Sequence, residues 1–304
     1  MSSYNLKNIK QEFKKNGVFY TPKELAYYMS SLIDIDVKNV YDPTCGDGSL
    51  LSVFNDNVEK YGQELNSHQL DIAKQNLVNF NGYCGDTLQA PAFIDKKFNC
   101  IIANPPFSIK WQPIENDIRF NQAPATPPES KADYAFLLHI IFMLKQDGIA
   151  IVLNFPGILY RGNKEGKIRE FLIKQNYIEK IIAIEGDTFV DTKIPTVLLI
   201  LKKNKKNTNI IFSNKKDNKT YVATINEIEK NNFNLSTNLY LREEKPKEII
   251  DPIKLNNDAR DTFIRQLQKE LIFDTIICDF EKLDKEFFAK QIIKVCNDYL
   301  NKIL

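Results

Sequence analysis

The sequence is poor in the residues that build metal centres and disulfide frameworks. It has only two histidines, His68 and His139, so no histidine cluster for a metal ion is visible. Its five cysteines are widely scattered and include no C-x-x-C pair, which indicates reduced and mostly buried thiols. Cys45 lies in a glycine-containing loop, where a small packing residue is expected rather than a nucleophile. The sequence therefore predicts neither a metal centre nor a disulfide framework.

Long apolar runs and a large excess of one charge are also absent. No segment reaches the length of a membrane span, and residues 1–15 are polar and charged, unlike a signal peptide. The formal net charge is only +2, so any surface for nucleic acid must be local. The hydrophobic content of 43% supports a sizeable core. We therefore expect a soluble, cytoplasmic protein with one large α/β domain and an appendage.

The most informative stretch of the chain is the polar motif Asn104-Pro105-Pro106-Phe107. It follows residues 98–103, which have the pattern of a buried strand. Pro105 and Pro106 restrict the backbone, so the segment is stiff. The Asn104 side chain and the Pro105 carbonyl can then present two acceptors at one point, with the Phe107 ring beside them. Two convergent acceptors and a stacking ring suit the exocyclic amino group of a flat base.

A glycine-containing loop follows another short apolar stretch earlier in the chain. The loop reads Asp42-Pro43-Thr44-Cys45-Gly46-Asp47-Gly48-Ser49. Its small residues let the backbone pass close to a ligand. Residues 50–54 read as the inner face of a following helix, so the segment predicts the start of a nucleotide-binding sheet. The loop is neither the dinucleotide fingerprint G-x-G-x-x-G nor the phosphate-binding G-x-x-x-x-G-K-[ST].

Two acidic residues stand at the ends of the next predicted strands. Glu64 lies about twenty residues after the glycine loop, where such folds place a carboxylate on ribose hydroxyls. Asp86 follows Gly85 at the end of a third predicted strand. Because ligands of such sheets bind at the carboxyl ends of the strands, both acids are expected to meet Asn104 and the glycine loop at one edge. Taken singly, Glu64 is typical of a surface acid and Asp86 of a turn residue.

Strands alternate with helices along the chain to about residue 201. A helix is expected over 23–32, with Thr21 as its N-cap and Pro22 as its first residue. A turn is expected at 145–148. Further strands are expected over 149–155, 178–184 and 196–201. This alternation predicts an α/β fold, a mostly parallel sheet with helices on both faces.

Taken together and in order, these motifs resemble those of N6-adenine DNA methyltransferases. The specific resemblance is to the modification (M) subunits of type I restriction-modification systems, and it covers roughly residues 10–242. Further blocks that resemble the family, in its order, are Ser130–Phe136, Tyr160–Gly162, Glu165–Arg169, Ile194–Thr196 and Phe233–Thr237. The resemblance implies a Rossmann-like fold that uses S-adenosylmethionine as cofactor.

The resemblance also assigns roles to individual residues. It implies that Asn104, Pro105, Pro106 and Phe107 transfer a methyl group to N6 of a flipped adenine in DNA. It places the ribose of S-adenosylmethionine at Glu64 and the adenine at Asp86. The remaining residues that it implies for the cofactor are Phe19, Tyr20, Thr21, Pro22, Lys23, Asp42, Gly46, Asp47, Gly48 and Ser49.

Two regions outside the motifs carry weaker expectations. The long loop over 109–131 follows the Asn-Pro-Pro-Phe motif and is expected to border the pocket for the target base. Its Trp111 either stacks on DNA or packs at the rim. The densest basic region comprises Lys202, Lys203, Lys205, Lys206, Lys215, Lys216 and Lys219. These lysines either contact phosphates or protect an edge strand with charge.

The last part of the chain differs in pattern from the rest. We expect a catalytic domain over 1–242 and a helical extension over 243–304, with amphipathic helices over 256–272 and 281–304. By resemblance, at least one helix joins a specificity (S) subunit, and a restriction subunit is a further possible partner. The alternative is that the helices pack on the chain's own domain.

Two departures from the family pattern are expected, together with three alternative functions. The family's usual N-terminal helical domain is absent from this sequence, and the region around 207–225 is shorter than usual. No target-recognition domain is apparent, so DNA sequence choice is expected to need a partner. The alternatives are methylation of a protein glutamine, methylation of an RNA base, and a catalytically silent scaffold in a restriction complex.

Overall fold

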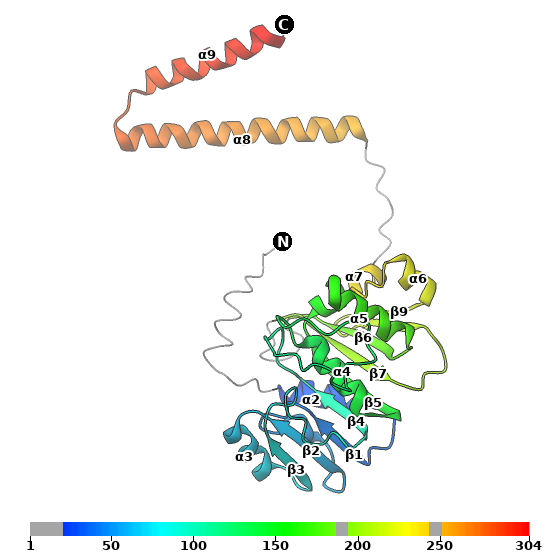
Figure 1. Cartoon of the computed structure of the whole chain (residues 1–304). Coiled ribbons are helices and arrows are strands. Elements are labelled where there is room, and N and C mark those ends of the chain that lie inside the picture. The colour runs from blue at the N-terminus through cyan, green and yellow to red at the C-terminus, as the bar shows by residue number, and fades with distance from the viewer. Residues whose placement is uncertain (1–20, 187–193, 243–250, 304) are drawn as a thin grey trace. The chain divides into compact units, whose positions relative to one another are not determined.

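A largely parallel β-sheet forms the centre of the first of two units, Met1–Arg242 and Glu243–Leu304, into which the computed structural model divides. The structure describes residues 21–186, 194–242 and 251–303. Within these residues the sheet has nine strands in the order β3-β2-β1-β4-β5-β7-β6-β8-β9 (Figure 1). The strands are β1 (Asn39–Asp42), β2 (Glu59–Glu64), β3 (Phe80–Cys84), β4 (Phe98–Ala103), β5 (Leu144–Asn154), β6 (Ile178–Ile184), β7 (Thr196–Lys202), β8 (Ile210–Asn214) and β9 (Thr220–Ala223).

The strand order has a topological switch point between β1 and β4. Strands β3, β2, β1, β4 and β5 pair in parallel, whereas β7 runs antiparallel to both β5 and β6. β8 is parallel to β6, and β9 ends the sheet as an antiparallel edge. The chain proceeds from β1 to β2 on one side and returns to β4 on the other. Open α/β sheets bind ligands at such a switch point, beyond the carboxyl ends of the strands.

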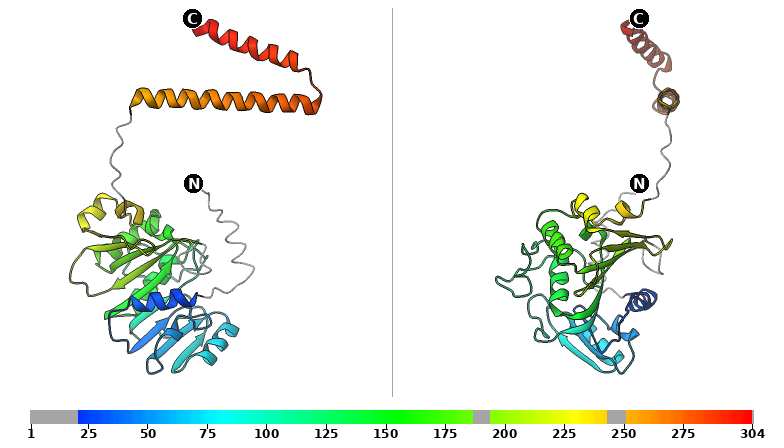
Figure 2. Two further views of the ribbon diagram at one scale, coloured as in Figure 1. Left: turned by 180° about the vertical axis from the view of Figure 1, so that it is seen from behind. Right: turned by 90° about the vertical axis from the view of Figure 1, so that its right-hand side faces the viewer.

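Helices cover both faces of the sheet and enclose two separate cores (Figure 2). One face carries α2 (Lys23–Ser31) and α3 (Ser67–Asn76). The other carries α4 (Asp133–Met143), α5 (Asn163–Lys174), α6 (Ile225–Lys230) and α7 (Thr237–Tyr240). Side chains of a strand alternate between faces, so in β4 Ile101 faces the α4 core and Ile102 faces the α2 core. The predicted α/β fold with helices on both faces is confirmed.

The expected helix after the glycine loop was wrong. Only the 3-10 turn η1 (Leu51–Val53) forms there, and Phe54 is already extended with φ −92° and ψ 144°. The chain must reach the start of β2 at Glu59, which leaves no length for further helical turns. The loop is therefore followed by a short turn whose Leu51 is fully buried.

Two other local expectations were also wrong. Thr21 does not cap the helix over 23–31; Pro22 is the N-cap residue, and no side chain bonds the first turn. The turn expected at 145–148 belongs to β5, because α4 passes directly into that strand. A register shift between Phe98 and Cys100 on β4 absorbs the extra residues of β5. The sequence also predicts a short polar helix over residues 1–16, which lie outside the described residues.

The second unit contains two helices in its described residues, α8 (Pro252–Glu281) and α9 (Lys285–Ile303). The expected boundaries were wrong, because α8 extends past both ends of 256–272 and Glu281 ends α8 rather than starting α9. Asp251 accepts a bond from the Ile253 backbone N–H (2.9 Å), which sets the start of α8. Lys282 ends it in a left-handed conformation with φ 55°. No helix in the described residues is long and apolar enough to cross a membrane.

Candidate functional site

The glycine loop lies at the carboxyl end of β1 and is shaped by bonds between near neighbours. Asp42 Oδ1 accepts from the Thr44 backbone N–H (2.9 Å). Asp47 Oδ1 accepts from the Ser49 backbone N–H (3.0 Å) and from its hydroxyl (2.6 Å). Each carboxylate therefore closes a local turn of the kind that aspartate favours. The result is a loop whose path is set by its own side chains.

The two glycines of the loop have different roles. Both have positive φ, +54° at Gly46 and +84° at Gly48. A Cβ at Gly48 would lie 2.7 Å from Leu77 Cδ1, so this position is filled by packing against the end of α3. A Cβ at Gly46 would meet nothing within 4 Å, so open space lies over that backbone. The loop thus combines a buried glycine with one that leaves room for a ligand.

Two further acids stand at the same edge, at the ends of the next strands. Glu64 Oε2 accepts from the Gly46 backbone N–H (2.9 Å), which joins the end of β2 to the glycine loop. Asp86 Oδ1 accepts from the Leu88 backbone N–H (2.8 Å), so Asp86 closes a turn after β3. Thr87 donates its hydroxyl to the Pro43 carbonyl (2.5 Å) and ties that turn to the loop. The structure therefore brings the acids together, as the strand order requires.

Burial changes the acid–base properties of the loop. Asp42 is 1% exposed, and burial raises the pKa of its carboxyl to about 7, with the Glu64 charge adding to the shift and the Thr44 bonds opposing it. Burial likewise raises the pKa of the Cys45 thiol, which is therefore protonated at neutral pH. A Cβ at Gly62 on β2 would lie 2.7 Å from Cys45 Sγ. Cys45 is a packing residue against β2, as expected.

The Asn104 amide is oriented by a residue far away in the sequence. Asn104 follows β4, and its Nδ2 donates to Thr21 Oγ1 at 3.1 Å. Because the amide nitrogen is engaged, its oxygen faces away from Thr21. In the described part of the chain, no donor is bonded to Asn104 Oδ1 or to the Pro105 carbonyl. Two acceptors are therefore available, and the half-buried Phe107 packs against the α2 core beside them.

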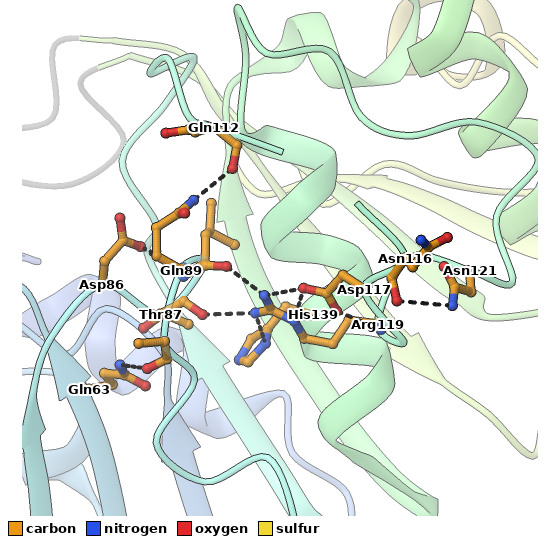
Figure 3. A network of polar contacts seen from close by, with 12 residues as sticks. Gln63, Asp86, Thr87, Gln89, Gln112, Asn116, Asp117, Arg119, Asn121 and His139 are labelled. Atoms are coloured by element: carbon orange, nitrogen blue, oxygen red, sulfur yellow. Dashed lines mark hydrogen bonds and ion pairs between the residues drawn. The ribbon is translucent and has the colours of Figure 1, made fainter. Parts of the chain in front are cut away.

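The loop over 109–131 is held to the cofactor side of the sheet by a buried arginine (Figure 3). Arg119 is 4% exposed and donates to the Thr87 carbonyl (2.8 Å) and to the Leu88 carbonyl (2.5 Å). Its Nε lies 3.0 Å from both Asp117 oxygens. Arg119 thereby anchors the loop to the turn that Asp86 begins. No local sequence pattern indicates this role of Arg119.

His139 on α4 extends this network to β1. Burial lowers the pKa of His139 to about 3, with the Arg119 charge adding to the shift, so the ring is neutral. Arg119 can only donate, so Nδ1 accepts from it (3.2 Å) and the Nε2 proton is left for the Tyr41 hydroxyl (3.2 Å). Tyr41 directly precedes Asp42. The network therefore runs from the long loop to the start of the glycine loop.

Trp111 and two lysines of the basic region have packing roles. Trp111 is 8% exposed, packs on Phe120 and donates Nε1–H to the Pro128 carbonyl (3.0 Å). These contacts favour packing at the rim over stacking on DNA. Lys203 and Lys205 cap backbone carbonyls, at Leu144 (2.7 Å) and Ile178 (2.6 Å) respectively. Burial, with the nearby Lys97 charge, lowers the pKa of Lys203 to about 8. These contacts favour the structural interpretation of those two lysines over phosphate contact.

The remaining predicted cofactor residues differ in burial and in their contacts with the site. Lys23 is exposed at the first position of α2, and Pro22 is half-buried before it. Phe19 and Tyr20 lie outside the described residues, so their expected role stays a prediction. Thr21 is buried and reaches the candidate site through Asn104. The site thus joins the start of α2 to the ends of β1, β2, β3 and β4.

Comparison with known proteins agrees with this arrangement. The family model described as N-6 DNA Methylase matches residues 3–222. The chain belongs to the N-6 DNA Methylase family. It is 31% identical to the type I restriction enzyme MpnII methylase subunit of Mycoplasma pneumoniae, over 89% of this chain and 62% of that protein. It is 33% identical to the HindI methylase subunit of Haemophilus influenzae, over 64% of this chain and 48% of that protein.

A solved structure supports the fold. The type I restriction-modification system methyltransferase subunit from Streptococcus thermophilus matches with a TM-score of 0.68 and 30% identity, over 74% of this chain and 59% of that one. The fold is thus that of the S-adenosylmethionine-dependent methyltransferases, with a C-terminal helical part. The chain spans between about half and two thirds of the length of these three relatives.

Proposed function

We propose that this chain is an S-adenosylmethionine-dependent DNA methyltransferase that modifies adenine N6, as the modification subunit of a type I-like restriction-modification system. The observation that carries the proposal is the pairing of two sites at one edge of the sheet. An open, acid-lined glycine loop ends β1, and a pair of available acceptors ends the adjacent strand β4. The family membership of the chain agrees with this pairing.

The cofactor side fits a cationic nucleoside. The open space over Gly46 admits a ligand close to the backbone, and the surrounding carboxylates favour a positive charge. Glu64 is the candidate for the ribose hydroxyls and Asp86 for the adenine. Bound S-adenosylmethionine would supply an electrophilic methyl group carried on its sulfonium. An acidic site of this kind would repel a phosphate, so a nucleotide cofactor is a poorer fit.

The target side fits an exocyclic amino group. Asn104 Oδ1 and the Pro105 carbonyl would each accept one N–H of the adenine amine, which favours a pyramidal nitrogen. The same acceptors would stabilise the positive charge that develops on N6 during transfer. Phe107 would stack on the base after it leaves the duplex, which offsets part of the unstacking cost of a few kcal/mol. Thr21 keeps the amide oxygen, rather than the nitrogen, available for this purpose.

DNA and the partner subunits belong to the same proposal. The relatives are named as methylase subunits of type I restriction enzymes, which suggests a complex rather than an enzyme that acts alone. The described helices α8 and α9 expose large apolar side chains, with Phe263 66% and Phe280 89% exposed. We propose that a specificity subunit covers part of this surface and that the complex, rather than this chain, chooses the DNA sequence.

Two experiments test the proposal. Calorimetry on the isolated chain should show binding of S-adenosylmethionine, and the absence of binding to folded protein would contradict the cofactor assignment. Modification-sensitive sequencing of DNA from cells that carry this gene and its neighbours should show methylated adenine at a defined sequence, which disappears when the gene is deleted. If DNA is unmodified but a protein glutamine or RNA is methylated, the chain is instead a protein-glutamine or an RNA methyltransferase. If DNA, RNA and protein glutamine all stay unmethylated, the catalytically silent scaffold is favoured.

A further inference from the structure

Three segments far apart in the sequence converge on Ser108, the residue that follows Phe107. Asp133, the first residue of α4, accepts from the Ser108 backbone N–H through Oδ1 (3.0 Å) and from its hydroxyl through Oδ2 (3.3 Å). Arg161 donates to the Ser108 hydroxyl (3.1 Å) and to Asp133 Oδ2 (2.8 Å). Arg161 also pairs with Glu165 on α5 at 2.9 Å. The cluster therefore links the end of β4 to the starts of two helices.

This cluster differs from the ion pairs on the surface of the protein. The side chains of Asp133, Arg161 and Glu165 are 1%, 15% and 7% exposed. Exposed pairs contribute little to stability, whereas removal of one partner from a buried pair leaves an uncompensated charge. Asp133 also lies at the amino end of α4, where the helix dipole favours a carboxylate. The cluster is thus a fixed feature from which Ser108 cannot easily be released.

Ser108 has a backbone conformation that needs such support. Its φ is +51°, in the left-handed region that residues other than glycine, asparagine and aspartate rarely adopt. Such conformations persist where the surroundings over-determine them, and they concentrate at functional sites. Ile109, the next residue, is also held in place, because its carbonyl accepts from the Ala132 backbone N–H (2.9 Å). The backbone that leaves Phe107 is therefore fixed on both sides of the turn.

We propose that Asp133 and Arg161 are positioning residues for methyl transfer, because they hold Ser108 in its left-handed conformation and so fix the direction in which Phe107 and the Asn104 and Pro105 acceptors meet the target base. The inference rests on the proposed function. Neither residue needs to touch the base. The competing view is that the cluster only stabilises the fold, in which case its loss would lower stability without changing the target site.

The first test removes the support from Ser108. In the complex with its specificity subunit, Asp133→Ala should lower the single-turnover methylation rate at least about tenfold at saturating cofactor and DNA, since small misplacements of reacting groups are costly. The dissociation constant for S-adenosylmethionine should stay within about twofold, because no cofactor contact is removed. With 2-aminopurine at the target position, the fluorescence of the flipped base should differ from that in the wild-type complex, because Phe107 no longer stacks in the same way.

The second test restores the conformation without the carboxylate. Asparagine and glycine tolerate positive φ, so Ser108→Asn or Ser108→Gly added to Asp133→Ala should recover most of the rate and the wild-type fluorescence. A role in fold stability alone predicts no such recovery. Lys60→Met is the matched control, because buried Lys60 caps the Asn55 carbonyl (2.8 Å) near the opposite end of the sheet. It should lower the melting temperature while leaving the rate of the folded enzyme unchanged.

The outcomes separate this inference from the proposed function. If the wild-type complex does not methylate DNA, the proposed function fails. If the wild type is active, two results would contradict the positioning role. In the first, Asp133→Ala has the rate and fluorescence of the wild type. In the second, Asp133→Ala loses rate, and neither Ser108→Asn nor Ser108→Gly restores it. If Asp133→Ala does not fold, Arg161→Gln takes its place, because it removes the guanidinium but keeps the Asp133 bond to the Ser108 N–H. Ser108→Gly added to Arg161→Gln should likewise recover most of the methylation rate. A lack of recovery would overturn the inference.

Discussion

The two halves of the candidate site are built in different ways. On the cofactor side, Asp42, Asp47 and Asp86 each accept from a backbone N–H two residues ahead, so each turn is closed locally. On the target side, Asn104 is oriented by Thr21, 83 residues away in sequence, and Ser108 is held by Asp133, 25 residues away. The turns on the cofactor side are therefore closed by near neighbours, while Glu64 and Thr87 join the glycine loop to the ends of the next strands. The target motif depends on distant segments that fold around it.

This difference predicts where substitutions will act. Changes on the cofactor side should alter affinity for S-adenosylmethionine through space and backbone path. Changes to the distant partners of the target motif should alter the transfer step while affinity for the cofactor is kept.

The largest effect is expected from Asn104→Ala. This change removes one of the two acceptors for the target amine, so the rate of adenine methylation should fall about a hundredfold or more. Affinity for S-adenosylmethionine should be unchanged in calorimetry. Asn99→Ala is the matched control, because Asn99 lies on β4, the strand that Asn104 follows, and its Oδ1 accepts from the Asn39 backbone N–H (3.1 Å). Asn99→Ala should lower stability without a comparable loss of methylation rate. Equal losses of rate in Asn104→Ala and Asn99→Ala would contradict the catalytic role of Asn104.

The next effect is expected from Gly46→Leu on the cofactor side. The leucine side chain would enter the open space over the loop, so the dissociation constant for S-adenosylmethionine should rise at least about tenfold, or about 1.4 kcal/mol. Gly46→Ala is the matched control, because it shares the strain of a positive φ but adds little volume. Calorimetry should show a much smaller loss for alanine. Similar losses in both variants would mean that backbone strain, rather than the space, decides affinity.

A smaller effect is expected from Thr21→Val. Loss of one neutral hydrogen bond of about 1 kcal/mol should lower the transfer rate roughly fivefold, because the Asn104 amide can then rotate. Thr21→Ser keeps the hydroxyl and should retain most of the rate. Single-turnover kinetics at saturating cofactor measure the effect. A raised dissociation constant for S-adenosylmethionine with an unchanged rate would place Thr21 on the cofactor side instead.

The smallest effect at neutral pH, and the clearest in acid, is expected from the buried network that joins the long loop to the glycine loop. Burial lowers the pKa of His139 from 6.5 to about 3, so the unfolded chain binds a proton that the folded chain excludes. The contribution of neutral His139 to the free energy of unfolding is therefore fully present above pH 6.5 and is lost as the pH falls toward about 3. Urea unfolding at pH 7.5 and at pH 5 should show a lower midpoint in acid. His139→Gln should reduce that difference, and an identical pH dependence in the variant would contradict the role of His139.

Features set by local sequence signals were easier to predict than contacts between distant segments. The strand before Asn104 was predicted over 98–103 and observed as β4 with those bounds, because its apolar run and the following prolines are local signals. The meeting of Glu64 with the glycine loop followed from strand order alone. The roles of Arg119, Thr21 and Ser108 could not be predicted, because each is defined by a partner on another segment. The turn at η1 was missed because the distance to β2, rather than the apolar pattern, limits its length.

The central claim is that the acceptors at the end of β4 receive the amine of adenine in DNA. The most direct measurement is mass analysis of nucleosides from DNA treated with the purified complex and S-adenosylmethionine labelled in the methyl group. The account predicts label in N6-methyladenine with the wild-type chain and at least about a hundredfold less with Asn104→Ala. Label in a cytosine, in RNA or in a protein glutamine, or equal labelling of adenine by the Asn104→Ala complex, would contradict it.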